Sequence, residues 1–399
     1  MRVFLRLTAL TVLAALTIPT PARAIPAFAR KYGVSCRLCH DPAPKLTAFG
    51  EQFAGNGFRF ASGEPPRDTL DVGDPLLDLM KSLPLALRVD AYIRGYTEGT
   101  GADFQTPYGF KLLSGGAIGP KLSYYVYFFL LERGEVGGVE DAFLYVNDIG
   151  NIPLDAAVGQ FQVSDPMFKR ELRLPIDDYM IYRTRVGAQT VDLTYDRGLM
   201  AAVDFAGFTL TGELLNGSGK EAAGADRKLD NNLFKNLFGH LTRDLAPFLR
   251  VGAMGYYGKT DGLETAGVDT LTNTTWMVGG DGTIAAGPIE LNVQYIHRED
   301  DAPTFTTGEV AAKTDGGFAE LVFRPAGSRW YGIALWNGMH ANVPVLDPRI
   351  GGPSGLDRYH SVTGGLGYLV RRNVRTYGEA TWDIERKEAV FGLGVTAAF

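Results

Sequence analysis

The chain has few cysteines, no long hydrophobic run beyond its N-terminal region and no excess of basic residues. Only two of its 399 residues are cysteine, so no further thiolate is present to complete a zinc site. No internal stretch approaches the roughly eighteen consecutive apolar residues of a membrane-spanning helix, which excludes a helical inner-membrane protein. The sequence carries 39 Lys and Arg against 45 Asp and Glu. Nucleic acid is therefore not an expected partner.

The N-terminus has the pattern of a secretory signal peptide. Arg2 and Arg6 precede a short apolar stretch, which ends in the small-x-small sequence Ala-Arg-Ala at residues 22–24. The apolar stretch is too short to remain as a membrane anchor. We therefore predict that residues 1–24 are a signal peptide and that the chain is exported.

The two cysteines and one histidine form a single motif, Cys-Arg-Leu-Cys-His, at residues 36–40. In such a motif the thiols of Cys36 and Cys39 can add to the two vinyl groups of a haem, while His40 is held under the iron as the proximal ligand. A redox dithiol would need a thioredoxin-like βαβ context and a zinc site would need more ligands, and neither is present. The sequence predicts one covalently attached haem c.

A short helix with an aromatic stripe is predicted after the motif. Leu46, Phe49 and Phe53 recur at helical spacing, and Gly55 and Gly57 supply a C-terminal stop. Phe49 and Phe53 are candidates to cover one face of the haem. From the pattern alone, a generic apolar stripe is an equally good interpretation.

The sixth position of the haem iron has one sulfur candidate. A second helix is predicted from Asp74, its cap, through Pro75 to Met80 and beyond. A thioether ligand would raise the reduction potential of the haem, which suits an iron that takes electrons from iron(II). A lone methionine on an apolar helix face packs more often than it binds a metal, so Met80 is only a candidate distal ligand.

From about residue 85 to the end of the chain, apolar and polar residues alternate with a period of two. In the first such segment an apolar face alternates with a polar one, namely Leu87, Val89, Ala91 and Ile93 against Arg88, Asp90, Tyr92 and Arg94. The polar face would look outward in a soluble sandwich and into a wet lumen in a membrane barrel, so the period alone does not decide. The C-terminal aromatic, Phe399, resembles the end of the last strand of bacterial outer-membrane barrels.

The connections between strands favour the barrel. About sixteen strands can be counted, and short turns alternate with mostly longer loops, of which the longest spans about 164–194. An even strand number with short periplasmic turns and long external loops is the layout of an outer-membrane barrel. We therefore predict an all-β fold: a transmembrane outer-membrane β-barrel of about sixteen strands over residues 85–399, preceded by a small helical haem-bearing plug domain at 25–84.

Other polar residues of the predicted barrel give weaker signals. Four histidines are predicted to be rim or lumen residues rather than haem ligands: His240, His297, His340 and His360. Four acidic residues lie in predicted loops, where carboxylates could attract cations but are more often solvated: Asp177, Asp178, Asp300 and Asp301.

The opening of the predicted mature chain, residues 25–58, resembles that of the fused monohaem cytochrome-porins, the outer-membrane iron(II)-oxidising cytochromes. The resemblance rests on these elements: Phe28-Ala29-Arg30, the C-x-x-C-H motif, Pro44-x-Leu46, Phe49-Gly50, Phe53 and Gly57-Phe58. In that family a small haem-bearing segment is fused to a porin, and the haem carries electrons across the outer membrane. The resemblance supports an electron conduit better than it supports iron oxidation in particular.

The leading hypothesis is an outer-membrane electron-transfer protein. Its haem would pass single electrons between an extracellular donor such as iron(II), met by the long loops, and a periplasmic c-type cytochrome. The haem domain would lie on the periplasmic side or within the lumen, the barrel would contact outer-membrane lipid, and the activity would be that of an iron(II):cytochrome c oxidoreductase. The alternatives are a diffusion porin with a haem-bearing plug or sensor, a conduit for another donor or acceptor, and a periplasmic cytochrome fused to a soluble β-domain.

Overall fold

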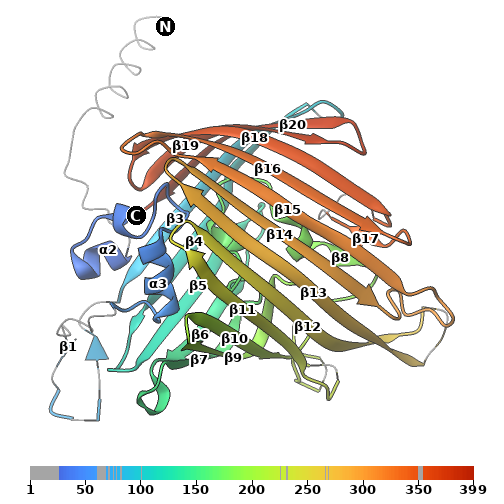
Figure 1. Ribbon diagram of the computed structural model, residues 1–399, viewed down its shortest axis with the longest axis horizontal. Coiled ribbons are helices and arrows are strands. Elements are labelled where there is room, and N and C mark those ends of the chain that lie inside the picture. Colours follow the sequence, from blue (N-terminus) through green and yellow to red (C-terminus); the bar gives the residue numbers. More distant parts are fainter. Residues whose placement is uncertain are drawn as a thin grey trace, which may run out of the picture.

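Sixteen antiparallel strands form one closed barrel in the described part of the chain (Figure 1). The structure is a computed structural model and describes residues 27–60, 69–70, 72–74, 76–77, 79–80, 83–99, 101–224, 226–230, 232–265, 267, 269–348 and 354–399. The predicted all-β barrel and its strand number are confirmed. The predicted signal peptide, residues 1–24, lies outside the described residues.

Each barrel strand pairs with its neighbours along the chain. In order the strands are β3 (Leu85–Tyr96), β4 (Ala102–Ala117), β5 (Leu122–Glu132), β6 (Val139–Val146), β7 (Leu154–Gln162), β9 (Tyr195–Phe205), β10 (Phe208–Leu215), β11 (Asn236–Ala246), β12 (Leu249–Leu263), β13 (Thr270–Ala286), β14 (Ile289–Asp300), β15 (Ala312–Phe323), β16 (Trp330–Ala341), β18 (Arg358–Arg371), β19 (Val374–Asp383) and β20 (Glu388–Ala398). The last strand, β20, pairs with β3, with Leu393 opposite Ile93. This pairing leaves the sheet without a free edge.

The barrel turns its apolar faces outward and its polar faces inward. Leu393 and Leu366 are 65% and 66% exposed, whereas Glu320 and Asn337 are 1% and 0% exposed. This inside-out arrangement suits a barrel that is surrounded by lipid and has a polar lumen. Exposed aromatic side chains also gather at the short-turn ends of strands, as in the girdles of such barrels: Phe205, Phe248, Phe323, Trp330 and Phe399.

Short turns and longer connections alternate as predicted. Two-residue turns at 206–207 and 247–248 lie at one end of the barrel, and the turn after β6 contains η2 (Ile149–Asn151). The longest connection, residues 163–194, starts from the other end. No helix among the described residues is long and apolar enough to cross a membrane.

Residues 163–194, the lumen loop, fold back into the barrel. The lumen loop contains η3 (Arg170–Leu172), α4 (Met180–Arg183) and β8 (Arg185–Val186), and β8 pairs with β17 (Leu346–Asp347). Its Tyr179 ring stacks on Phe318 of β15 with a centroid distance of 4.2 Å. Apolar side chains of the loop and the wall thus form a core within the lumen.

Polar side chains of the barrel wall bind the lumen loop from several directions. The Tyr182 hydroxyl donates to Gln294 (2.8 Å) and the Tyr179 hydroxyl to Glu320 (3.0 Å). Glu379, from β19, accepts from the backbone N–H of Ile176 (2.8 Å). These contacts explain why the loop lies inside, because buried backbone and hydroxyl groups need partners that a polar lumen supplies.

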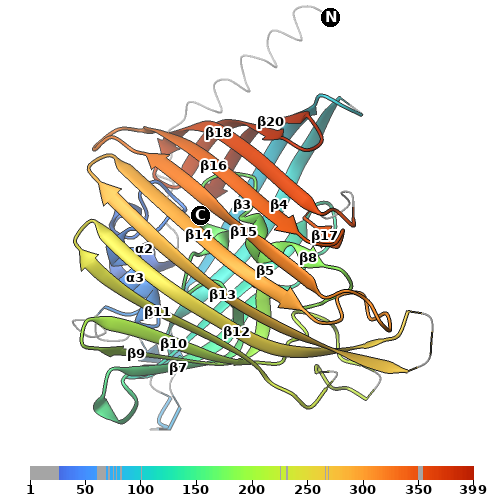
Figure 2. The same cartoon turned by 45° about the vertical axis from the view of Figure 1, so that its right-hand side comes forward.

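The N-terminal segment lies at the short-turn end of the barrel in both views (Figures 1 and 2). It contains α2 (Ala27–Tyr32), η1 (Cys36–Leu38) and α3 (Ala48–Gly55). The predicted helix is therefore present as α3, and it begins where the Thr47 hydroxyl accepts a hydrogen bond from the Gly50 N–H (3.1 Å).

The second predicted helix is wrong over its described residues. Asp74 caps a single turn, in which Leu77 N–H donates to its carbonyl (3.1 Å). The chain is then extended as β2 (Leu79–Met80), which pairs with β1 (Thr69–Leu70). Leu76 is 94% exposed, so the turn lacks the apolar contacts from which short helices gain most of their stability.

Substitutions at Leu393 test whether the exposed apolar face of the barrel contacts lipid. Leu393→Lys places a charge in the middle of β20 on the exposed face and should destabilise the barrel by about 2–4 kcal/mol in a bilayer. Urea unfolding in phospholipid vesicles measures this loss. The matched variant Leu393→Ala keeps the face apolar and should cost clearly less. Equal, small losses in both variants would contradict a lipid-facing position.

Candidate functional site

The C-x-x-C-H motif folds into one tight turn. Cys39 N–H and His40 N–H both donate to the carbonyl of Cys36, at 3.2 and 2.9 Å, and Ser35 caps the turn by accepting from Arg37 N–H (3.3 Å). The two thiols and the imidazole are thereby brought together on one short element. The predicted site residues Cys36, Cys39 and His40 form a compact group.

The His40 ring is oriented by its own backbone neighbourhood. Its Nδ1 lies 2.6 Å from the carbonyl oxygen of Pro44, and since a carbonyl only accepts, Nδ1 carries the proton. Burial lowers the pKa of His40, although hydrogen bonds that the ring makes to the backbone of Pro44 and Lys45 act in the opposite direction. A neutral imidazole with a fixed Nδ1–H leaves Nε2 free as a metal ligand.

The two cysteines do not have the features of a redox dithiol. Both are free thiols. Burial raises the pKa of Cys36 and of Cys39 above the ordinary range, whereas a reactive dithiol requires a lowered pKa. The thiols therefore fit covalent attachment of a group better than disulfide exchange.

Helix α3 packs directly on the motif turn. Thr47 N–H donates to the Cys39 carbonyl (2.9 Å) and the Thr47 hydroxyl to the Leu38 carbonyl (2.7 Å). A Cβ atom on Gly50 would lie 2.2 Å from the Cys39 carbonyl oxygen. The glycine after Phe49 is thus required by the close approach of helix and motif.

An aromatic cluster fills the space beside the motif. Phe53 is 6% exposed and contacts Phe28 edge to face, with a centroid distance of 5.3 Å. Phe28 stacks on Phe58 (5.3 Å), which in turn stacks on Tyr125 of β5 (4.6 Å). The cluster therefore joins the N-terminal segment to the barrel wall.

Polar contacts hold the same segment to the short-turn end. Lys45 pairs with Glu290 at 2.7 Å, and Asp41 pairs with Arg324. Sequence reasoning did not identify these partners, because each pair joins residues more than 200 positions apart and neither partner lies in a motif.

A cavity of about 1080 Å³, the motif cavity, lies between the N-terminal segment and the lumen loop. Five predicted site residues line it: Cys36, Cys39, His40, Phe49 and Phe53. Its size is at the upper end of protein sites for cofactors. Thiols, a free imidazole Nε2 and the aromatic side chains beside them suit a haem c. Met80, on β2, is not among the described residues that line this cavity.

One histidine of the barrel shares the motif cavity. His240, 2% exposed, lines it and binds Asp281 through Nε2 at 2.8 Å. His240 therefore lies in the lumen, one of the two positions expected for it, the rim and the lumen. No group of three or more His, Cys, Asp or Glu in the described part of the chain is arranged to hold a metal ion.

Porin barrels have the same architecture as this chain. OmpT of Vibrio cholerae, as a loop L8 deletion mutant, is similar with 14% identity and a TM-score of 0.55 over 80% of this chain and 99% of that chain. The outer-membrane channel DcaP of Acinetobacter baumannii is similar with 11% identity and a TM-score of 0.54, over 80% and 97% of the two chains. OmpF of Salmonella typhi, in complex with daunomycin, has 12% identity and a TM-score of 0.54, over 79% and 97%.

Neither the family models nor the curated proteins give a match to this chain. At identities of 11–14% the likeness to solved structures concerns the fold. The chain has a porin-like outer-membrane β-barrel fold with a small helical region at its N-terminus.

Gly50 tests the packing of α3 on the motif. Gly50→Ala should force the helix and the Cys39 carbonyl apart and cost about 1–3 kcal/mol. Faster limited proteolysis of the N-terminal segment in the folded, detergent-solubilised protein would report this change. Gly55→Ala is the matched control, because a Cβ atom there meets nothing within 4 Å. Equal proteolysis of both variants would contradict the close approach.

Proposed function

We propose that the protein is an outer-membrane electron-transfer protein, in which one haem c sits in the motif cavity at the periplasmic mouth of a porin-like barrel. The observation that carries the proposal is the motif turn itself. It presents two free thiols and the free Nε2 of His40 to a cavity between the N-terminal segment and the lumen.

Cys36 and Cys39 would hold the haem through thioether bonds, His40 would bind the iron, and Phe49 and Phe53 would pack against the macrocycle. The bound haem would supply one-electron chemistry. The chain's own residues orient the imidazole and keep the site against the barrel wall. A carrier is needed there because the apolar belt of such a barrel is about 25 Å tall and insulating.

The donor and acceptor follow from the resemblance of residues 25–58 to the monohaem cytochrome-porins. An extracellular donor such as iron(II) would be oxidised, and a periplasmic c-type cytochrome would be reduced. Short turns face the periplasm in outer-membrane barrels, which would put the N-terminal segment beside its acceptor. The activity would then be that of an iron(II):cytochrome c oxidoreductase.

A diffusion channel is the second candidate. The likeness to the outer-membrane channel DcaP and to OmpF favours it. The packing of the lumen loop against Phe318 and Glu320 speaks against a wide pore. In this reading the N-terminal segment would be a plug or a sensor.

Electron transfer and diffusion can be separated in proteoliposomes. The wild-type protein should retain haem on a denaturing gel, be reduced by iron(II) and reduce an enclosed cytochrome. The Cys36→Ala/Cys39→Ala variant should lose all three properties and still show heat-modifiable gel migration, because the barrel does not depend on the thiols. Ion conductance without electron transfer in the wild-type protein would favour the channel.

Met80→Ala tests the sixth ligand. Met80 does not line the motif cavity, so we expect the variant to keep the optical spectrum and midpoint potential of the haem. Visible spectroscopy and a redox titration measure both quantities. A changed spectrum together with a lowered potential would instead identify Met80 as the distal ligand.

A further inference from the structure

The lumen loop separates two cavities whose lining residues differ in the sign of their formal charge. The second, the loop-side cavity, measures about 570 Å³ and is lined by residues near the long-loop end. Arg88, Glu171 and Arg375 line both cavities. Five Arg and Lys side chains and eight carboxylates line the motif cavity, whereas nine Arg and Lys and seven carboxylates line the loop-side cavity. The excess of charge therefore changes sign across the loop.

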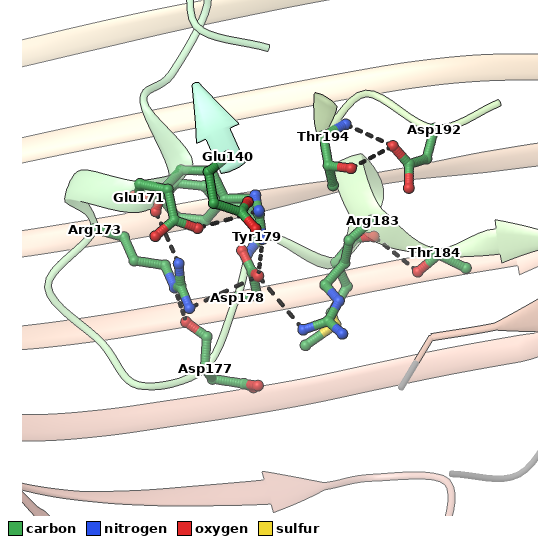
Figure 3. A network of polar contacts seen from close by, with 12 residues as sticks. Glu140, Glu171, Arg173, Asp177, Asp178, Tyr179, Arg183, Thr184, Asp192 and Thr194 are labelled. Carbon is green, nitrogen blue, oxygen red and sulfur yellow. Dashed lines mark hydrogen bonds and ion pairs between the residues drawn. The ribbon is translucent and has the colours of Figure 1, made fainter. Parts of the chain in front are cut away.

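Six cationic side chains and three carboxylates line the loop-side cavity next to the lumen loop, and five of the cations pair with the carboxylates. We call this group the arginine cluster: Arg88, Lys111, Arg170, Arg173, Arg183 and Arg375, with Asp90, Glu171 and Asp178. Asp178 Oδ2 lies 2.7 Å from Arg170, 3.5 Å from Arg183 and 3.7 Å from Arg173. Figure 3 shows Arg173 and Arg183 approaching Asp178 from opposite sides.

The loop carboxylates of the arginine cluster are ionised. Burial would raise the pKa of Asp178, but the guanidinium groups of Arg170, Arg173 and Arg183 outweigh it and hold the pKa below its ordinary value. Burial would likewise raise the pKa of Glu171, but Lys111 and the surrounding arginines outweigh this effect and lower the pKa. Even with all three carboxylates charged, the cluster keeps three positive charges in excess.

Arg375 contributes to this excess of positive charge because none of the described carboxylates pairs with it. It is 4% exposed and has no carboxylate partner among the described residues. Its Nη1 donates to the Leu174 carbonyl and to the Tyr331 hydroxyl, both at 3.1 Å, while its Nε and that of Arg170 have no partner in the described part of the chain. A buried charge without a counter-charge is strongly unfavourable, so an anion that reaches Arg375 is favoured there.

The other carboxylates of the loop-side cavity do not remove the excess. Glu132 and Glu140 pair with Arg133 and Lys220. Asp192 accepts from the N–H and hydroxyl of Thr194, and Asp347 accepts from the N–H of Gly355. Counted over all its lining residues, the loop-side cavity still has two more cationic side chains than carboxylates.

We propose that the loop-side cavity binds a small polyvalent anion, a carboxylate or phosphate compound, at the arginine cluster. Guanidinium groups bind both kinds of anion through paired N–H donors. Arg183 is the most available of these donors, because its one contact in the cluster is Asp178 at 3.5 Å. The proposal does not depend on a haem in the motif cavity.

Calorimetric titration of the full-length protein in detergent, at low ionic strength, tests the site with citrate and separately with inorganic phosphate. Saturable binding of at least one of them is expected, and Arg183→Gln should weaken it about tenfold or more. Arg250→Gln is the matched control, because it removes one arginine from the motif cavity of the same barrel. It should change the affinity less than about twofold.

Heat-modifiable migration verifies that both variants are folded. If Arg183→Gln does not fold, Arg183→Lys replaces it, since lysine keeps the charge and loses the paired donors, and a clear loss of affinity is again expected. Absence of binding with both anions, or equal weakening by the Arg183 and Arg250 variants, would overturn the proposal. Equal weakening would mean that the net charge of the lumen, and not a site, attracts the anion.

Discussion

The pairing of β20 with β3 is the contact on which the rest of the structure depends. In a bilayer no water is available to bind the backbone N–H and C=O groups of an edge strand, so a sheet that crosses it must close. Once the ring is closed, the apolar face meets lipid and the polar face encloses the lumen. The remaining parts of the chain, the lumen loop and the N-terminal segment, then pack inside this lumen or at its end.

Two parts of the chain fill it, and they do so by different means. The lumen loop is held by hydroxyl, amide and carboxylate groups of the wall, such as Gln294 and Glu320, and by packing on Phe318. The N-terminal segment enters at the short-turn end and is held by aromatic stacking on Tyr125 and by ion pairs such as Lys45 with Glu290. Between them lies the motif cavity, so the C-x-x-C-H turn faces the protein interior.

Local patterns in the sequence were accurate where the local chain decides the structure. The period of two located the strands, because each strand needs only to separate an apolar from a polar face. Helix α3 was found because its cap, its aromatic spacing and its glycine stop all lie within about ten residues. The helix predicted through Met80 was wrong because its apolar residues, such as Leu76, have no surface to cover.

The sequence by itself determined the strand number, the inside-out faces and the group of Cys36, Cys39 and His40, since these depend on residues close together in the chain. Only the tertiary structure decided that residues 163–194 lie within the lumen and that Asp178, expected to be a solvated loop residue, is buried among arginines. The physical reason is that these outcomes depend on partners such as Asn337 and Arg375, which come from distant strands. Barrel closure brings those strands together, and a pattern of neighbouring residues in the sequence does not predict which distant side chains then meet.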